Sequence, residues 1–379
     1  MVTGKGTVSK RLKGDYGRRN PSRFTDVLRP VVFWNITYRC NLECQHCYMR
    51  SGPWASKPEL SEEEMISVAK QIVDQGVPLV VFTGGEPLVK EGFWRTAEYL
   101  SQYKRPALSL SSNGTVITRE VAGRLAGLGF KYVGISIDST DPSKHDSFRR
   151  VKGAFSRAVE GIKNTVEAGI PAGIRTTVSK WNYRETPRIL ELADKLGVSR
   201  VSLYLLDTVG RGEEIAGDLM TPAMVEEWAD MLIDLAREYQ DNIEILVVRG
   251  NFVGIYIAWK LATSKEEFEE YLSMIQAQGD CGRKTVSIYP DGTVRPCQFI
   301  DQVVIGDLRR QRLRDILRED NPMLKPFLDI PSHLRGPKCS LCPFKHVCGG
   351  GSRNRAYVVN GDFWGDDPLC PIDPGKTRF

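Results

Sequence analysis

The stretch Cys40-Asn-Leu-Glu-Cys44-Gln-His-Cys47 decides how this chain of 379 residues is interpreted. Its three cysteines have the spacing C-x3-C-x2-C in a short polar loop, directly after the apolar run Val31-Val-Phe-Trp-Asn-Ile36. Three thiolates on one loop can hold three irons of a cubane iron–sulfur cluster and leave the fourth iron open to a small molecule. The spacing also fits a zinc knuckle or three unrelated core thiols. Zinc needs four ligands, and His46 is the nearest candidate for the fourth.

The remaining cysteines favour a metal or redox role. All nine fall into two groups, the first at positions 40, 44 and 47 and the second at positions 281, 297, 339, 342, 348 and 370. Residues 1–21 lack the apolar stretch of a secretory signal, and no apolar run reaches the ~18–20 residues that cross a bilayer. The sequence therefore predicts a cytoplasmic protein. Because disulfides rarely persist in the cytoplasm, nine cysteines there indicate metal or redox chemistry.

The N-terminus is basic. Seven Lys or Arg residues and one acidic residue, Asp15, lie between positions 5 and 23, and the net charge of the whole chain is +5. We expect residues 1–28 to form a solvated arm or to steer an anionic substrate. No nucleic-acid-binding motif accompanies the charge, so a nucleic-acid partner is not predicted.

Strand and helix patterns alternate after this arm. Short runs of β-branched and apolar residues predict strands at 31–36, 79–82, 107–110, 132–137, 172–178 and 201–205. The clearest helix covers about 61–75, where Ser61 and Glu64 form a capping box. Alternating elements predict an α/β fold with parallel strands, whose functional residues lie at the carboxyl ends of the strands.

Polar residues follow several of these predicted strands. Gly84, Gly85 and Glu86, in Thr83-Gly-Gly-Glu-Pro87, combine a backbone that can approach a ligand closely with a carboxylate. The same residues also suit an ordinary strand–turn–helix junction. Ser136 and Asp138 share one face of the fourth strand, where they either bind a ligand or cap the next helix.

Arg175 lies on the fifth predicted strand. It is either a cation that faces a buried site or a charge at the surface edge of the sheet.

The second cysteine group begins beside a predicted hairpin. Residues 287–294 contain the turn Pro290-Asp-Gly292, with Cys281 before the first strand and Cys297 after the second. A Cys-x2-Cys-x5-Cys array and a distant fourth cysteine follow: Cys339, Cys342, Cys348 and Cys370. Four such thiolates can hold either zinc or an iron–sulfur cluster.

Taken together, C-x3-C-x2-C followed by Tyr48 and the complete Gly-Gly-Glu-Pro motif resemble the radical S-adenosylmethionine (SAM) enzymes. The resemblance implies a partial (β/α)6 barrel and a [4Fe-4S] cluster with an open iron, held by Cys40, Cys44 and Cys47. In that family the open iron binds SAM, whose reductive cleavage gives a 5′-deoxyadenosyl radical that abstracts hydrogen from the substrate. The resemblance further implies SAM contacts from the Gly-Gly-Glu segment and from three side chains: Ser136, Asp138 and Arg175.

The C-terminal array resembles the SPASM domain, a small cysteine-rich domain that holds auxiliary clusters. Transferred residue by residue, the resemblance implies one auxiliary [4Fe-4S] cluster ligated by Cys339, Cys342, Cys348 and Cys370. Ser352 stands where the full pattern has a further cysteine, so a third cluster near Cys281 and Cys297 is doubtful. These two residues are otherwise expected to be free thiols or substrate contacts. The predicted organisation is 1–28 basic arm, 29–240 radical SAM core, 241–280 linker helices and 281–379 SPASM-type domain.

Residues 29–40 and 348–370 resemble the enzymes that trim siroheme-derived tetrapyrroles in haem and d-type haem synthesis. The resemblance implies side-chain decarboxylation or deacetylation of a tetrapyrrole, with reduced ferredoxin or flavodoxin as the electron donor. Arg353 and Arg355, beside the auxiliary cysteines, are predicted to pair with substrate carboxylates. The alternatives are a maturase of a ribosomal peptide or partner enzyme, and a zinc- or cluster-binding scaffold. No side chain is assigned a catalytic role.

Overall fold

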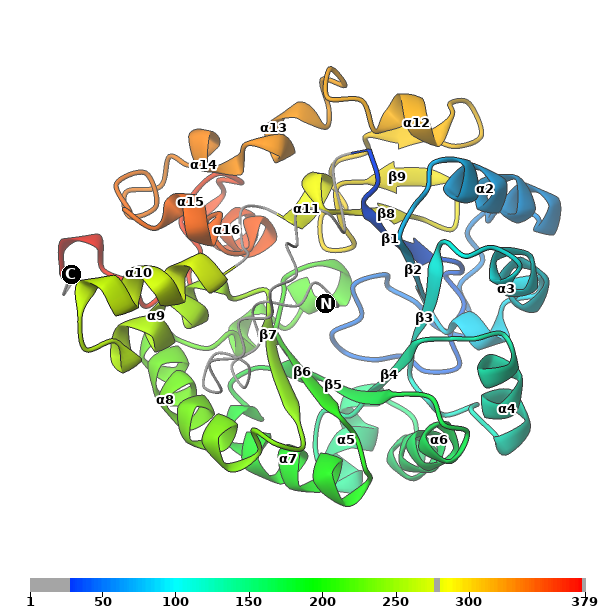
Figure 1. Cartoon of the computed structure of the whole chain (residues 1–379), viewed down its shortest axis with the longest axis horizontal. Coiled ribbons are helices and arrows are strands. Elements are labelled where there is room, and N and C mark those ends of the chain that lie inside the picture. Colours follow the sequence, from blue (N-terminus) through cyan, green and yellow to red (C-terminus); the bar gives the residue numbers. More distant parts are fainter. Residues whose placement is uncertain (1–27, 276–279, 377–379) are drawn as a thin grey trace.

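One curved sheet of ten strands organises the molecule, in the order β10-β9-β8-β1-β2-β3-β4-β5-β6-β7. The structure, a computed structural model, describes residues 28–275 and 280–376. Nearly all of the predicted basic arm, residues 1–28, therefore lies outside the described residues. Figure 1 shows the sheet curving around a central space with its helices on the outer side.

The first seven strands are parallel to their neighbours, as expected for an α/β fold. They are β1 Val31–Asn35, β2 Leu79–Thr83, β3 Ala107–Ser112, β4 Tyr132–Ser136, β5 Ala172–Val178, β6 Arg200–Leu205 and β7 Glu244–Val248. All six predicted strands are present, with bounds that differ by two residues or fewer.

Helices connect these strands across the outer face of the sheet. They are α2 Glu62–Asp74, α3 Phe93–Ser101, α4 Arg119–Gly127, α5 Pro142–Arg149, α6 Ala154–Glu167, α7 Thr186–Lys195 and α8 Pro222–Glu238. The predicted capping box is present at the start of α2, where Ser61 accepts a hydrogen bond from the backbone of Glu64 and the Glu64 side chain accepts one from Ser61.

The segment 241–280, predicted to contain only linker helices, is different. Its first part is β7, which pairs with β6 over Glu244–Val248 and extends the barrel sheet. Two helices follow, α9 Asn251–Leu261 and α10 Lys265–Met274. The prediction missed β7 because its apolar run is short and is flanked by helical patterns.

The predicted hairpin joins the other edge of the same sheet. Its strands are β8 Thr285–Ile288 and β9 Thr293–Arg295, and β10 Gly306–Asp307 pairs with β9. β8 also pairs in parallel with β1, and Asn35 Nδ2 donates to Ser287 Oγ at 2.6 Å. The C-terminal region is therefore fixed to the strand that precedes the first cysteine loop.

Short helices complete the C-terminal region: α11 Asp280–Arg283, α12 Leu313–Ile316, α13 Lys325–Leu328, α14 Ile330–His333, α15 Lys345–Cys348 and α16 Arg353–Asn360. α15 packs on α9, where Asn251 Nδ2 donates to the Cys348 carbonyl at 2.9 Å. Figure 1 shows α14–α16 near α9 and α10, and α13 nearer to α11.

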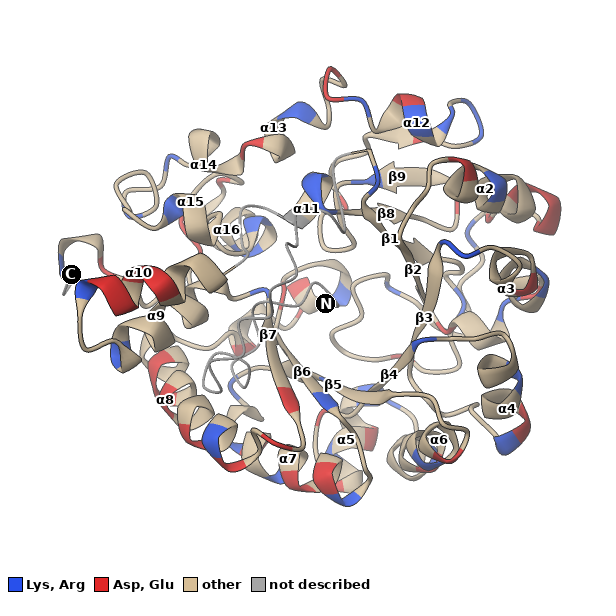
Figure 2. Ribbon diagram, viewed as in Figure 1, with Lys and Arg blue, Asp and Glu red and all other residues tan. Residues whose placement is uncertain are grey.

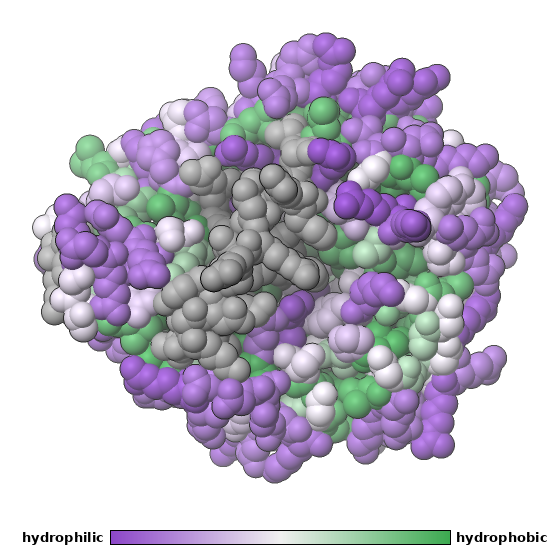
Figure 3. Space-filling model, viewed as in Figure 1, coloured by the Kyte–Doolittle hydropathy of each residue, from purple (hydrophilic) through white to green (hydrophobic). Residues whose placement is uncertain are grey.

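The main core lies between the sheet and its helices. Alternate residues of β1 and β2 enter it, including Trp34 and Phe82, whose rings stack at 5.8 Å. Charged residues are frequent on the outer helices, as Figure 2 shows, and hydrophilic residues form most of the outer rim in Figure 3. Within residues 28–275 and 280–376, no helix has the length and apolar character needed to span a membrane.

Candidate active site

The carboxyl ends of β1–β6 surround one cavity of about 140 Å³. Residues that end or follow each of these six strands line it, together with Gln298 and Phe299 from the segment after β9. Cys40, Cys44 and Cys47 all face this cavity. The structure therefore brings the three cysteines of the first loop together at the edge of the sheet where function was expected.

Hydrogen-bond donors surround the three sulfurs. Leu42 N lies 3.4 Å from Cys40 Sγ, Ser51 N lies 3.3 Å from Cys47 Sγ, and Arg149 Nη1 lies 3.5 Å from Cys44 Sγ. Burial raises the pKa of the Cys40 and Cys44 thiols. The uncharged thiol is therefore favoured until a metal replaces the proton, and the donors then stabilise the thiolates.

The glycines of the Gly-Gly-Glu-Pro motif pack against the cysteine loop. Gly84 has φ +127°, a conformation that favours glycine, and a Cβ at Gly85 would collide with the Arg39 carbonyl. Gly85 N donates to the Thr37 carbonyl at 2.8 Å. Both glycines also line the cavity. They thus allow two loops and a ligand to meet where a side chain has no room.

Glu86 lies behind the cavity wall and is not among the residues that line the cavity, so its predicted SAM contact stays a prediction. Its carboxylate is fully buried and accepts from Ser112 Oγ at 2.9 Å and Asn113 N at 2.8 Å. Burial raises the pKa of Glu86 to about 7, and these donors oppose that shift. Since Ser112 and Asn113 line the cavity, Glu86 acts by holding the loop after β3 in place.

Ser136 and Asp138, predicted together, are separated. Ser136 lines the cavity, whereas Asp138 is fully buried outside the lining. Asp138 accepts from Arg149 Nε at 2.7 Å and Thr177 N at 2.9 Å. Asp138 therefore orients Arg149, which does line the cavity and contacts Cys44. Sequence reasoning missed Arg149. The usable signal was an arginine at the end of the helix that follows the segment Ser136-Ile-Asp138.

Arg175 faces the cavity, as one of its two sequence interpretations requires. Its guanidinium lies over the Tyr204 ring, 4.6 Å from the centroid. The Gly210-Arg-Gly212 loop after β6 packs against the cysteine loop, where Arg211 Nε donates to the Cys44 carbonyl at 2.7 Å.

The second cysteine array surrounds a separate, enclosed cavity. Cys339, Cys342, Cys348 and Cys370 all line it, with apolar walls from Phe252, Ile255 and Ile372. Burial raises the pKa of Cys339 and of Cys348 to about 12. Among the described residues, no three His, Cys, Asp or Glu side chains meet closely enough to share a single metal ion. Four sulfurs spaced around a cavity suit a cluster with four separate corners.

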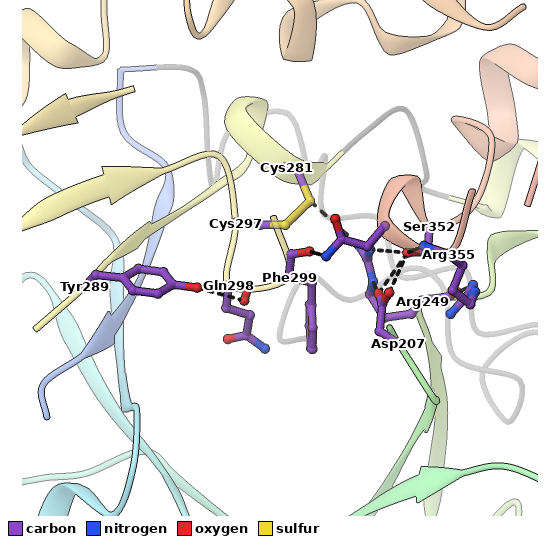
Figure 4. Close-up of a disulfide and its surroundings, with 10 residues drawn as sticks. Asp207, Arg249, Cys281, Tyr289, Cys297, Gln298, Phe299, Ser352 and Arg355 are labelled. Carbon is purple, nitrogen blue, oxygen red and sulfur yellow. Dashed lines mark hydrogen bonds and ion pairs between the residues drawn. A yellow bond between two sulfur atoms is a disulfide. The ribbon is translucent and has the colours of Figure 1, made fainter. Parts of the chain in front are cut away.

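Cys281 and Cys297 form a disulfide, with 4.9 Å between their Cα atoms. Figure 4 shows it above Gln298 and Phe299 and beside Asp207, Arg249 and Ser352. Ser352 Oγ donates to Asp207 at 2.8 Å. Arg249 donates to the Asp207 carboxylate at 2.7 Å and to Ser352 Oγ at 2.8 Å. A polar network therefore occupies the place of the missing cysteine, and the expected free thiols are paired.

Arg353 and Arg355 are wrongly predicted as substrate-carboxylate ligands. Arg355 is completely buried and pairs with Asp367 at 2.7 Å. Arg353 is also buried, and its guanidinium donates to backbone carbonyls, including that of Gly365 at 2.7 Å. Arg353 is used within the C-terminal region, whereas Arg355 also donates to the Leu206 carbonyl at 3.1 Å, because irregular loops leave carbonyls that need buried donors.

The residues present fit the predicted cofactors. Three cysteines on one wall of the first cavity would hold three irons of a cubane cluster and leave the fourth iron without a protein ligand. The four cysteines of the second cavity can complete a closed cluster. The assignment of individual ligands stays a prediction.

Comparison with known proteins identifies relatives of the whole chain. Residues 34–205 match the Radical SAM superfamily, and residues 280–343 match the SPASM family, an iron-sulfur cluster-binding domain. The chain is 32% identical to Fe-coproporphyrin III synthase of Methanosarcina barkeri, covering 99% of this chain and 97% of the relative. It is 32% identical to pre-heme d1 synthase of Dinoroseobacter shibae (92% and 88% covered). It is 31% identical to AdoMet-dependent heme synthase of Methanosarcina barkeri (91% and 97% covered).

Among solved structures, Streptococcus suis SuiB bound to S-adenosylmethionine superposes with a TM-score of 0.70. The two chains are 16% identical, and the match covers 91% of this chain and 77% of SuiB. At that identity the comparison shows a shared fold.

Proposed function

Since the chain belongs to the radical SAM enzymes with a C-terminal SPASM domain, we propose that it removes a carboxyl or acetate group from a siroheme-derived tetrapyrrole. The family's cofactors are SAM and [4Fe-4S] clusters. The observation that carries the proposal is the cavity itself, which combines three cysteines, two glycines and the cation of Arg175. Three relatives above 30% identity have tetrapyrrole products in their names, which favours a tetrapyrrole over a peptide.

In this proposal Cys40, Cys44 and Cys47 hold the cluster whose open iron binds SAM. When bound, these groups supply a 5′-deoxyadenosyl radical that abstracts hydrogen from the substrate. Gly84 and Gly85 keep the cavity wall thin enough for SAM to approach. Arg149, fixed by Asp138, holds a positive charge beside Cys44 and stabilises its thiolate.

Cys339, Cys342, Cys348 and Cys370 hold the auxiliary cluster in this scheme. Their cavity of about 20 Å³ has no room for a substrate, which suits electron transfer. The site also fits a purely structural role. A reduced ferredoxin or flavodoxin as electron donor stays a prediction.

The test is anaerobic reconstitution with iron, sulfide, SAM and dithionite, followed by incubation with siroheme-derived tetrapyrroles. We expect 5′-deoxyadenosine and a tetrapyrrole product that has lost carboxyl or acetate groups, both measured by liquid chromatography and mass spectrometry. The matched control is the Cys44→Ala variant, which should form neither. Release of 5′-deoxyadenosine with every tetrapyrrole left intact would contradict the proposed substrate, and the rival peptide maturase would then be tested.

A further inference from the structure

We propose that Arg175 forms a subsite for a carboxylate of the substrate, beside the amide of Gln298 and an aromatic shelf made by Tyr48, Tyr204 and Phe299. All five residues line the same cavity. The subsite accepts a flat conjugated ring that carries carboxylate arms. This inference rests on the proposed function and adds to it the residues that recognise the substrate.

Arg175 is built into the inner face of the barrel. Its backbone is paired with Ser136 on β4 and with Ser202 on β6. A Cβ on Gly134 would lie only 2.6 Å from Arg175 Cδ, so this glycine leaves the space through which the long side chain extends. The guanidinium then rests on Tyr204, which fixes its plane and lowers the entropy lost when a ligand binds.

Arg175 also differs in its charge balance from the other cations at this site. Arg149 is paired with Asp138, and Arg249 is paired with Asp207. Across residues 28–275 and 280–376, no carboxylate forms an ion pair with Arg175. A half-buried guanidinium without a counter-ion favours an anion in the cavity, and its planar fork suits a carboxylate.

Gln298 adds a neutral polar group to the same wall. The residue is buried, and its side-chain Oε1 has no hydrogen-bond partner among the described residues. Its backbone is fixed by Tyr289, whose hydroxyl donates to the Gln298 carbonyl at 3.2 Å. Figure 4 shows the Gln298 side chain and the Phe299 ring directed toward the same open space. A buried acceptor without a partner costs free energy unless a ligand N–H or O–H group donates to it, so Gln298 suits a polar hydrogen of the ligand while Arg175 suits its carboxylate.

The aromatic shelf gives the subsite its shape. The Phe299 centroid lies 5.6 Å from that of Tyr48 and 6.4 Å from that of Tyr204. Arg249 lies over the Phe299 ring at 4.9 Å and, held by Asp207, supports it. The rings are tilted against Phe299 by 51° and 45°, so together they line the cavity with apolar aromatic surface that a conjugated macrocycle can contact.

The experiment measures binding of two probes to reconstituted holoenzyme: coproporphyrin III, which has four carboxylates, and its tetramethyl ester, which keeps the ring without the charges. Absorbance titrations compare wild type with Arg175→Gln, Arg175→Lys and Gln298→Leu. The control is Arg124→Gln, which removes a surface arginine that also stacks on an aromatic ring, Trp94, at 4.1 Å. Thermal melts check that each variant is folded.

We expect wild type to bind the acid more tightly than the ester. Arg175→Gln should weaken binding of the acid by roughly tenfold or more, because a charge-assisted hydrogen bond is lost, and should change binding of the ester little. Arg175→Lys should recover part of the loss, Gln298→Leu should cause a smaller one, and Arg124→Gln should bind as wild type does.

Titration of the same variants with SAM distinguishes the two carboxylates that Arg175 could bind. A loss of affinity confined to SAM would assign Arg175 to the SAM carboxylate and overturn the inference. Equal binding of the acid by wild type and Arg175→Gln would overturn it as well. Failure of wild type to bind either porphyrin would overturn the proposed tetrapyrrole substrate, and the subsite with it.

Discussion

The two cysteine sets that are predicted to hold clusters differ in what surrounds them. The loop cysteines Cys40, Cys44 and Cys47 open onto a cavity of about 140 Å³, which six strands and the segment after β9 line. The four C-terminal cysteines surround a small enclosed space with apolar walls. A cluster held by three thiolates has an open iron that can bind and activate a ligand. A cluster held by four thiolates has no open iron, so it suits electron transfer or a structural role.

Their supports, in contrast, are alike. A buried ion pair lies behind each set: Asp138 with Arg149 behind the first, and Asp367 with Arg355 behind the second. Arg149 reaches the sulfur of Cys44, and Asp367 accepts a hydrogen bond from Ser352 N, four residues after Cys348. The difference in function therefore comes from the number of cysteines and the space beside them, and the buried scaffolding is common to both.

Removing one loop cysteine should have the largest effect. Cys40→Ala, Cys44→Ala and Cys47→Ala should each reduce SAM cleavage to the protein-free background, because two thiolates cannot keep the open cluster in place. About four irons per chain should remain, in the closed auxiliary cluster. The measurements are 5′-deoxyadenosine by chromatography and iron by colorimetry. Persistent cleavage in all three variants would show that the loop is not the SAM site.

Removing one C-terminal cysteine should separate SAM cleavage from product formation. Cys342→Ala should lower iron to about four per chain and stop turnover of the tetrapyrrole, since no second cluster can exchange electrons with the substrate. SAM cleavage without substrate should continue, because the cavity at the first loop is distinct. Zinc in place of iron at this site, or full turnover by the variant, would reduce the second set to a structural role.

Breaking the ion pair behind the second set should destabilise the protein. Asp367→Asn leaves Arg355 buried without its carboxylate, and we expect a loss of about 3 kcal/mol in the free energy of unfolding. The matched control is Asp362→Asn, whose partner Arg335 is exposed, with an expected loss below about 1 kcal/mol. Denaturant titrations measure both losses of unfolding free energy. Equal losses would contradict the greater importance of the buried pair over the exposed one.

A smaller effect should appear in acid. Burial, followed by the charge of Arg149, lowers the pKa of His145 to about 4, although Asp138 and Asp146 oppose this shift. Between pH 6.5 and 4 the unfolded chain therefore binds more protons at His145 than the folded chain does. Stability should be complete above pH 6.5 and should fall as the pH falls toward 4.

The His145→Asn variant tests this dependence. Its unfolding free energy should vary less steeply with pH, by up to about 1.4 kcal/mol per pH unit. The surface control is His333→Asn, which removes an exposed histidine and should leave the slope unchanged. Parallel pH profiles for wild type and His145→Asn would contradict the role of burial.

Local patterns were sufficient to predict strands β1–β6, the capping box of α2 and the positions of both cysteine sets. The sequence could not show which polar residue faces the cavity. Ser136 and Asp138 lie two positions apart, and only the packing of Arg149 from α5 explains why Asp138 is buried. Likewise, Arg353 and Arg355 look available in sequence, but their partners come from distant segments, including Leu206 and Asp367. Long-range pairing of this kind leaves no local signal.

The Cys281–Cys297 pair provides the weakest expected effect and the sharpest limit on the comparison. Cys281→Ser with Cys297→Ser should leave about eight irons per chain, as in wild type, because the pair is oxidised and Ser352 replaces a needed ligand. Thiol titration of denatured, metal-free wild-type protein should detect two more thiols after reduction than before it, whereas the double variant should show no such increase. About twelve irons in wild type, with four lost in the double variant, would show a third cluster. The second cysteine group would then hold two clusters, and the polar network of Asp207, Arg249 and Ser352 would have to rearrange to admit one of them.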